Sequence, residues 1–409
     1  MARRLLPAGL VILVTAGCGG TGAGAPAVTP APRSKPAETT GRPPDDAGAI
    51  EALLRQRALA LERRDVAALT GTAAGPQRGR DRRSVRWTAQ LSRLRVRVVS
   101  DELDITGDHA QIALTLSYRV RGMSRPFLTA RRLTARRTYA GWRVSRDAAR
   151  REPLPWEVAP FKATRAPHLV LLSPPGVDAA RLRSGLSGAY RELESALPQR
   201  ELPRSVLVIA ARDASQAGQL AGRIARGVVA LANASVQFGP KPALAVERVL
   251  AERIIVIDAR WSELPAPERQ STLVHELTHT ALNTATSGRT PPWLAEAVAL
   301  HLSGDDRAAE ARLRAAGAGA GASVGLRELC RPNSIFKLDG REQGAAYAAS
   351  SGAAEVIVAR RGTKGLLRLY EAFNNPAIDG PTCVATTDRA LRRTLDMSLA
   401  ELEAAVAGR

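Results

Sequence analysis

The chain has 409 residues, enough for two or three domains, and 45% of them are hydrophobic, so a substantial core can form. Its formal net charge is +20, from 59 Lys and Arg against 39 Asp and Glu, and aromatic residues make up only 4%. No basic run is interleaved with aromatic residues that could stack on bases, so we expect no nucleic-acid partner. An arginine-rich surface facing an anionic cell envelope is the simpler explanation of the charge.

Residues 1–17 have the features of an export signal. Two arginines stand near the start, and the apolar stretch from Leu5 to Thr15 is too short to span a membrane. The small residues before Cys18 resemble a bacterial lipobox, in which the cysteine is acylated and becomes the mature N-terminus, although an aliphatic residue is usual in place of Thr15. We expect a lipid on Cys18 to anchor the protein at the outer face of the cytoplasmic membrane, with secretion as the alternative.

Residues 18–46 are dominated by Gly, Pro, Ala, Ser and Thr and contain almost nothing to bury. This composition predicts a flexible tether that lifts the folded part off the membrane.

The chain has three cysteines, Cys18, Cys330 and Cys383. With a lipid on the first, the other two can form one disulfide in an oxidising compartment, and two free thiols are the alternative. No CxxC spacing occurs, so a thiolate metal site is not expected.

Residues 47–155 are expected to form a first module. A helix is predicted from Ala47 to Thr70, and alternating segments then predict antiparallel strands at 94–103, 109–120, 127–140 and 141–148. A helix followed by such a meander resembles the cone-shaped α+β fold of the nuclear-transport-factor and cystatin-like superfamily. No catalytic set is evident in the module, and His109, in a Gly-Asp-His turn, is expected to be exposed.

A Pro-rich junction at 152–160 separates this module from a second region, residues 160–409. Its predicted elements alternate between strands and helices, with strands at 168–172, 204–211 and 253–258, and helices over 177–198 and from 213 onward. The stretch 315–323 is rich in Ala and Gly and has low complexity.

The second region contains the sequence VHELTHTALN, residues 274–283. Pro265 and Pro267 before it, and Gly288, Pro291 and Pro292 after it, predict a helix between these breakers that includes the whole stretch. His275 and His279 are one helical turn apart and point the same way, which suits two ligands of one zinc ion. Glu276 lies beside the first histidine and is the candidate general base that takes a proton from the zinc-bound water.

Catalytic zinc needs a third protein ligand, and Glu296, in the apolar segment TPPWLAEAVALHLSG, is the candidate. A carboxylate in such surroundings needs a partner, and a metal ion can be that partner. A helix-start glutamate favoured by the helix dipole is the alternative. His301 competes as a ligand, but it lies about 140° round the helix from Glu296, so both cannot readily face one ion.

HELTH followed by PPWLAEAVALHL resembles the gluzincin metallopeptidases, a thermolysin-like clan with an HExxH helix and a downstream glutamate ligand. The resemblance implies that His275, His279 and Glu296 bind zinc and that Glu276 is the general base. It also implies that an edge strand before the helix binds the substrate backbone, the place taken by RIIVID at 253–258.

The chain departs from the clan's pattern in three places near Glu296. One is His301, which replaces an aromatic residue common in similar proteins. Ala297 stands where glycine is common, and Leu300 stands where an acidic residue usually bonds a ligand histidine. Asp305 or Asp306 is the possible substitute for that acid.

Related peptidases also have a Tyr or His that stabilises the oxyanion, and similar proteins carry a Tyr-x-x-Ser near this point, matched here by Tyr347 and Ser350. Tyr347 is therefore the candidate oxyanion stabiliser, with a buried structural tyrosine as the alternative. The remaining segments predict a helical C-terminal lobe, which a Cys330–Cys383 disulfide would tie together.

Together these observations predict an α+β protein: a cone-like module followed by a peptidase region with a small sheet, an HExxH helix and a helical lobe. The expected activity is zinc-dependent hydrolysis of peptide bonds outside the cytoplasm. The alternatives are an inactive zinc-holding protein that acts as an envelope binding module, and a peptidase-like scaffold without metal.

Overall fold

The computed structural model describes most of the chain. It covers residues 15–16, 46–89, 91, 94–150, 152–200, 202–222, 228–238, 246–305, 324–331, 334–335, 338 and 340–408. Cys18, Asp306 and residues 315–323 lie outside this part, as do the expected export signal and tether apart from Thr15, Ala16 and Asp46. Among the described helices, none combines the length and the apolar character needed to cross a bilayer.

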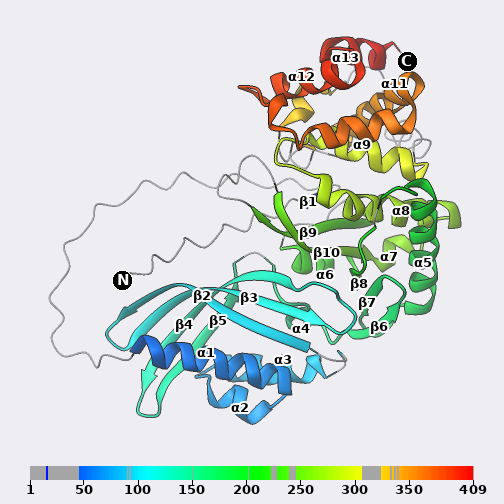
Figure 1. The fold of residues 1–409 in the computed structure, drawn as a ribbon. Helices are drawn as coiled ribbons and strands as arrows, with labels where there is room; N and C mark the ends of the chain where they lie inside the picture. The colour runs from blue at the N-terminus through cyan, green and yellow to red at the C-terminus, as the bar shows by residue number, and fades with distance from the viewer. Residues whose placement is uncertain are drawn as a thin grey trace.

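The first module consists of helices packed on a four-stranded sheet (Figure 1). Its strands follow one another in the order β2-β3-β4-β5, and every pairing is antiparallel, as predicted. The elements are α1 (Asp46–Arg63), α2 (Val66–Gly71), α3 (Gln77–Thr88), β2 (Leu94–Thr106), β3 (His109–Val120), β4 (Phe127–Thr138) and β5 (Gly141–Ala149). His109 begins β3 and its side chain is exposed, as expected.

The helices of this module differ from the prediction in two ways. The single helix expected over 47–70 is two helices, because Arg64 adopts a left-handed conformation with φ 59° and the Asp65 side chain then caps α2 by accepting from Ala68 N. Helix α3 is not predicted from the sequence, because its outward positions are mostly arginines. It buries mainly polar side chains, including Gln77 and Asp81, which apolar periodicity cannot detect.

The second sheet has the order β1-β9-β10-β8-β7-β6. Strands β7, β8 and β10 are parallel neighbours, while β6 and β9 pair antiparallel to theirs. The bounds are β1 (Thr15–Ala16), β6 (Lys162–Ala166), β7 (Leu169–Ser173), β8 (Val206–Ala211), β9 (Ala230–Phe238) and β10 (Val246–Ile257), with helices α4 (Pro155–Val158), α5 (Ala179–Ala196), α6 (Ala214–Ala221) and α7 (Asp258–Trp261).

The expectation that RIIVID forms the edge strand is wrong. These residues belong mostly to β10, which lies between β8 and β9. Strand β9, ALANASVQF, was not predicted, because its small and polar residues give no clear alternation of apolar and polar positions. It separates β10 from the short strand β1, so the position next to the sheet's edge belongs to β9.

The two faces of this sheet contact different parts of the protein. Ile254 and Val256 of β10 pack in one core with residues of α5 and helix α8 (Ala266–Leu282), while Ile255 and Ile257 pack in another core shared with the first module. The predicted 47–155 and 160–409 division follows the two sheets, but the core is continuous across it.

A buried ion pair reinforces the contact between the two regions. Arg253 of β10 is 1% exposed, pairs with Glu152, and stacks over the Phe127 ring with its guanidinium carbon 4.6 Å from the ring centroid. Replacing either charged partner alone would remove the opposite charge from a buried ion, which is costly in a protein interior.

The C-terminal lobe is helical, as predicted, and it covers α8 in successive layers of α9 and α11 (Figure 1). Its elements are η1 (Asn283–Ala285), α9 (Pro292–Ser303), η2 (Glu328–Cys330), α11 (Gly340–Ala372), η4 (Pro376–Ile378), α12 (Cys383–Leu395) and α13 (Leu399–Ala407). The sulfurs of Cys330 and Cys383 are 2.09 Å apart, so the expected pair joins η2 to the start of α12. The protein is of the α+β class, as predicted.

Candidate metal centre

Helix α8 carries two of the candidate ligands and has clear sequence reasons for its bounds. Pro265 occupies the N-cap position and Glu268 lies in the first turn, where an acidic side chain favours the helix dipole. Every residue from 272 to 282 is buried, because the second sheet and α5 lie on one side of the helix and the C-terminal lobe lies on the other. The histidines are therefore held in a helix that is enclosed on several sides.

Helix α9 carries the third candidate ligand. Pro291 and Pro292 start it, and Gly304, in the left-handed region with φ 64°, ends it. Trp293, Leu294 and Ala297 have no exposed surface and pack in the core of the lobe. This packing fixes the helix against α8 and leaves Glu296 2% exposed.

The two helices bring His275, His279 and Glu296 together. The two Nε2 atoms are 3.2 Å apart, and Glu296 Oε2 lies 3.3 Å from the His275 Nε2 and 3.6 Å from the His279 Nε2. Zinc bound tetrahedrally at about 2.0–2.1 Å requires ligand atoms about 3.3–3.4 Å apart. The three observed distances are close to that value, so the triangle has the size of one face of a metal tetrahedron.

Direct hydrogen bonding explains this geometry less well. A charged imidazole and a carboxylate normally approach to about 2.7–2.9 Å, whereas here the separations are 3.3 and 3.6 Å. Within the described part of the chain, the buried Oε2 of Glu296 meets no donor in good hydrogen-bond geometry. The buried side chains of His275, His279 and Glu296 could therefore hold a metal ion. Among the described residues, this is the group of His, Cys, Asp or Glu side chains whose ligand atoms lie close enough together to do so.

The carboxylate is ionised in this environment. Burial alone raises the pKa of Glu296, but attraction to the neighbouring His279 and His275 side chains outweighs it and lowers the pKa to about 2. A ligand carboxylate must be deprotonated to bind metal. The site therefore presents an anionic oxygen beside two imidazole nitrogens at neutral pH.

The other candidate residues fall in different places. Glu276 follows His275 in α8 and is 3% exposed. His301 Nε2 lies 2.8 Å from the Thr363 hydroxyl, so the structure keeps this histidine out of the metal group. The Ser350 hydroxyl donates back to the Ala346 carbonyl of its own helix, 2.8 Å away.

Tyr347 lies in α11, half-buried against the core of the lobe, with its hydroxyl oxygen enclosed. Its role as oxyanion stabiliser stays a prediction. Asp305, one of the two acidic candidates that the resemblance suggested, is buried, and Leu300 is 3% exposed.

The turn between the two helices is fixed by contacts that the sequence did not indicate. The Thr286 and Tyr370 hydroxyls are 2.7 Å apart, and Asn374 Nδ2 donates to the Ala285 carbonyl at 2.6 Å. These bonds join the end of α8 to the end of α11. Burial raises the pKa of Tyr370 to about 12, so its hydroxyl stays protonated. No motif connects residues so far apart in sequence, so no local signal could have identified them.

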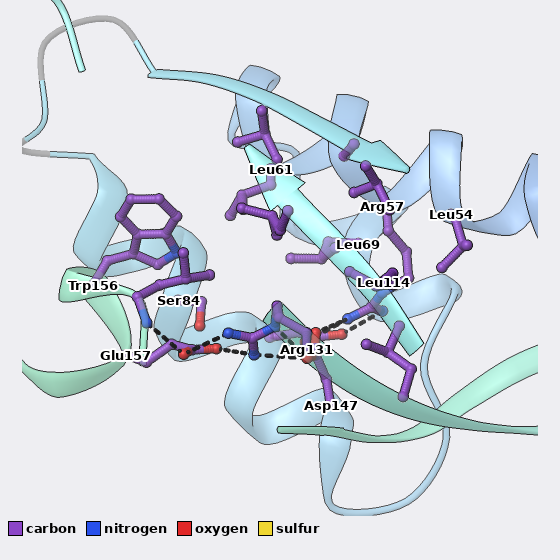
Figure 2. Close-up of a pocket in the computed structure, with 17 residues that line it drawn as sticks. Leu54, Arg57, Leu61, Leu69, Ser84, Leu114, Arg131, Asp147, Trp156 and Glu157 are labelled. Atoms are coloured by element: carbon purple, nitrogen blue, oxygen red, sulfur yellow. Dashed lines mark hydrogen bonds and ion pairs between the residues drawn. The ribbon is translucent and has the colours of Figure 1, made fainter. Parts of the chain in front are cut away.

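The first module contains a cavity of about 50 Å³, closed at its polar end by an ion network (Figure 2). Arg57 forms two hydrogen bonds to Asp81, at 2.8 and 3.0 Å, and Arg131 pairs with both Glu157 and Asp147. Arg131 is 1% exposed, and although burial lowers its pKa, the adjacent Asp147 and Glu157 raise it further than burial lowers it. These pairings satisfy the charged groups internally, and they are a structural feature of the module.

Comparison with known proteins identifies no family for this chain. No family model matches it, and no curated protein matches it. Among solved structures, it is similar to Rv3472, a protein of unknown function from Mycobacterium tuberculosis, with 17% identity over 27% of this chain and 77% of that one, at a TM-score of 0.21. A likeness at that TM-score carries no argument about fold or function, so the assignment rests on the site itself.

Proposed function

We propose that the protein is a zinc-dependent metallopeptidase of gluzincin type. The observation that carries this proposal is the triangle of His275, His279 and Glu296 ligand atoms, 3.2 to 3.6 Å apart and buried between two helices. Two imidazoles and one carboxylate form the ligand set typical of catalytic zinc with an open fourth position. Harder ions such as Mg²⁺ prefer all-oxygen sites, which argues for zinc over them.

Zinc held there supplies a Lewis acid and lowers the pKa of a water molecule that it binds. The chain's own contribution is the placement of Glu276, next to His275 in the same rigid helix, as the residue that accepts the proton of the attacking water. Burial of the site limits the number of competing waters and strengthens electrostatic interactions within it. Tyr347 remains the candidate donor to the oxyanion.

The sheet supports a position for an extended peptide. Strand β9 packs against α8, and its outer edge pairs with two residues of this same chain, Thr15 with Asn233 and Ala16 with Ala232. That short strand also contacts α9, the helix of Glu296. We infer that a substrate backbone binds antiparallel along β9, by the strand addition that exposed sheet edges favour.

The test is peptide hydrolysis by the zinc-loaded protein and by Glu276→Gln, against a peptide library. Removal of a general base typically costs about 10²–10⁴ in rate, so the variant should bind zinc normally and lose at least a hundredfold in cleavage. Glu263→Gln, at an exposed site before the same helix, is the matched control and should keep full activity. Equal cleavage by wild type and Glu276→Gln would refute the catalytic role.

An inactive zinc-holding envelope protein is the second candidate, and one observation favours it. Leu300 is buried where thermolysin-type sites have an acidic residue that orients a ligand histidine. The same assay separates the two candidates, since this alternative predicts one zinc per chain and no cleavage by either protein.

The proposal includes export and a lipid on Cys18, which would put the site outside the cytoplasm. The two cysteines at bonding distance in the lobe support an oxidising compartment.

A further inference from the structure

The positive charge of the chain is concentrated in its first module. Residues 47–155 contain 23 arginines and 10 acidic residues, with no lysine, whereas the whole chain has a net charge of +20. About a quarter of the chain therefore carries more than half of the excess charge. Such an asymmetry is typical of a surface that meets an anionic partner.

Much of this charge lies on the outer face of the four-stranded sheet, the face turned away from α1 and α3. The strands alternate between buried and exposed residues, and the exposed set includes Arg95, Arg119, Arg132, Arg136 and Arg146. The register makes Arg95 and Arg119 direct cross-strand neighbours, and likewise Arg136 and Arg143. Side chains directly opposite each other have Cβ atoms about 4.5–5.5 Å apart.

Like charges at that distance destabilise a sheet, and a sequence can avoid them by placing a neutral or acidic residue on one strand. Across the described residues, none of Arg119, Arg132, Arg136, Arg143 and Arg146 forms an ion pair with a carboxylate within 4.0 Å. The acidic side chains at 101, 102 and 104 lie on β2, which β3 and β4 separate from β5. The carboxylate of Asp108, in the β2–β3 turn, lies beside the His109 imidazole. The repulsion is relieved when an anionic surface covers the face.

The end of this face at the β4–β5 turn has a second feature. Tyr139, at the tip of the turn, is fully exposed. It lies in the turn beyond the Thr138–Gly141 pair, two residue pairs further along than Arg136 and Arg143. A tyrosine flanked by arginines suits the headgroup region of a bilayer, where the ring lies among lipid chains and the guanidinium groups contact phosphates. A row of stacking rings, as single-stranded nucleic acid requires, is not present on this face of the described strands.

We propose that the outer face of this sheet, at its β4–β5 end, docks the protein on a membrane rich in anionic phospholipid. Arg132, Arg136, Arg143 and Arg146 contact the phosphates, and Tyr139 inserts at the headgroup level. The inference does not depend on the metallopeptidase proposal, because it uses neither the metal group nor the second sheet.

The test is co-sedimentation with vesicles, using the chain from Gly19 onward, which retains everything described from Asp46 to Gly408 and cannot carry a lipid on Cys18. The vesicles contain either phosphatidylcholine alone or phosphatidylcholine with phosphatidylglycerol. Each arginine near an anionic bilayer contributes about fivefold to partitioning, so a variant with all four arginines changed to Gln should bind the anionic vesicles at least tenfold more weakly. Tyr139→Ala should weaken binding less.

The matched control removes the same charge from the C-terminal lobe, where Arg360, Arg361, Arg368 and Arg393 are exposed. Changing these four to Gln should alter vesicle binding by less than about threefold, and binding of the wild type should fall steeply with salt. The sheet variant should unfold at the same temperature as the wild type or a higher one, because it removes a like-charge pair. Equal losses in the two variants, equal binding to neutral vesicles, or tighter binding to DNA or RNA than to anionic vesicles at the same salt would each overturn the proposal.

Discussion

Glu296 Oε2 lies 3.3 Å from His275 Nε2, across the contact between α8 and α9. The two residues belong to different helices, so their approach depends on how α9 packs against α8. That packing is held by the buried apolar residues of α9 and by the Thr286–Tyr370 bond at the turn. The site is thus a product of the lobe's tertiary structure as much as of the HELTH motif.

Replacing one ligand should abolish tight metal binding. We expect His279→Asn to weaken zinc affinity by at least a hundredfold, because two protein ligands cannot hold a catalytic zinc ion. A competition titration with a chromophoric chelator measures this. His301→Asn is the control: its imidazole bonds to Thr363, outside the metal group, so zinc affinity should not change. A large loss of affinity in His301→Asn would contradict the ligand set.

The sequence predicted the ligand group and the order of the main elements, and it failed where local pattern carried no information. The two histidines could be identified because a separation of one helical turn suits a shared metal ion, and Glu296 because a carboxylate in an apolar segment needs a partner. Strand β9, which stands where RIIVID was expected, gives no apolar alternation and owes its place to pairing with β10. Helix α3 could not be predicted because its buried residue Asp81 is stabilised by Arg57, which is far away in sequence. Tertiary partners of this kind cannot be read from a single segment.

Metal removal should destabilise the folded protein measurably. A ligand at about 1,000 times its dissociation constant stabilises the native state by about 4 kcal/mol. We therefore expect the melting temperature to fall by several degrees when zinc is stripped and to return when zinc is added back. In Glu296→Gln, zinc should produce little or no shift. An unchanged melting temperature in the wild type would count against a metal in this site.

The ion network of the first module should contribute strongly to stability. Asp81→Ala removes the carboxylate that accepts two hydrogen bonds from Arg57. Arg57 is only 8% exposed. Removing one member of a buried pair costs about 3–5 kcal/mol, and urea unfolding should show a loss of this size. The exposed pair Glu51–Arg55, one helical turn apart, is the comparison. Glu51→Ala should cost well under 1 kcal/mol, since such helix pairs contribute roughly 0.3–0.5 kcal/mol. Similar losses of unfolding free energy in the two variants would show that burial does not make the Arg57–Asp81 pair more important than a surface pair.

The Cys330–Cys383 link closes a loop whose ends are 53 residues apart in sequence. In the chain-entropy account, a loop of this length corresponds to about 4 kcal/mol of stability. The double variant Cys330→Ser, Cys383→Ser should therefore unfold at a clearly lower urea concentration. It should still bind zinc, because neither cysteine belongs to the metal group. Loss of zinc binding in the folded double variant would mean that the lobe's crosslink positions the site.

Export and anchoring can be tested separately from catalysis. Cells expressing the chain and labelled with a fatty acid analogue should yield a labelled protein in the membrane fraction, and Cys18→Ser should abolish the label. Cys383→Ser controls for label at another cysteine and should keep it. Label that persists in Cys18→Ser would rule out the anchor at that residue.

The central claim is that His275, His279 and Glu296 bind one zinc ion together. X-ray absorption spectroscopy at the zinc edge, on protein whose metal content has been measured, tests this most directly. We predict about one zinc per chain, with two imidazole nitrogens at about 2.0–2.1 Å and oxygen ligands at about 2.0–2.2 Å, and with one oxygen fewer or a lost ion in Glu296→Ala. Folded protein that binds no zinc would contradict the account. So would a zinc absorption spectrum that shows no imidazole ligand and does not change in Glu296→Ala.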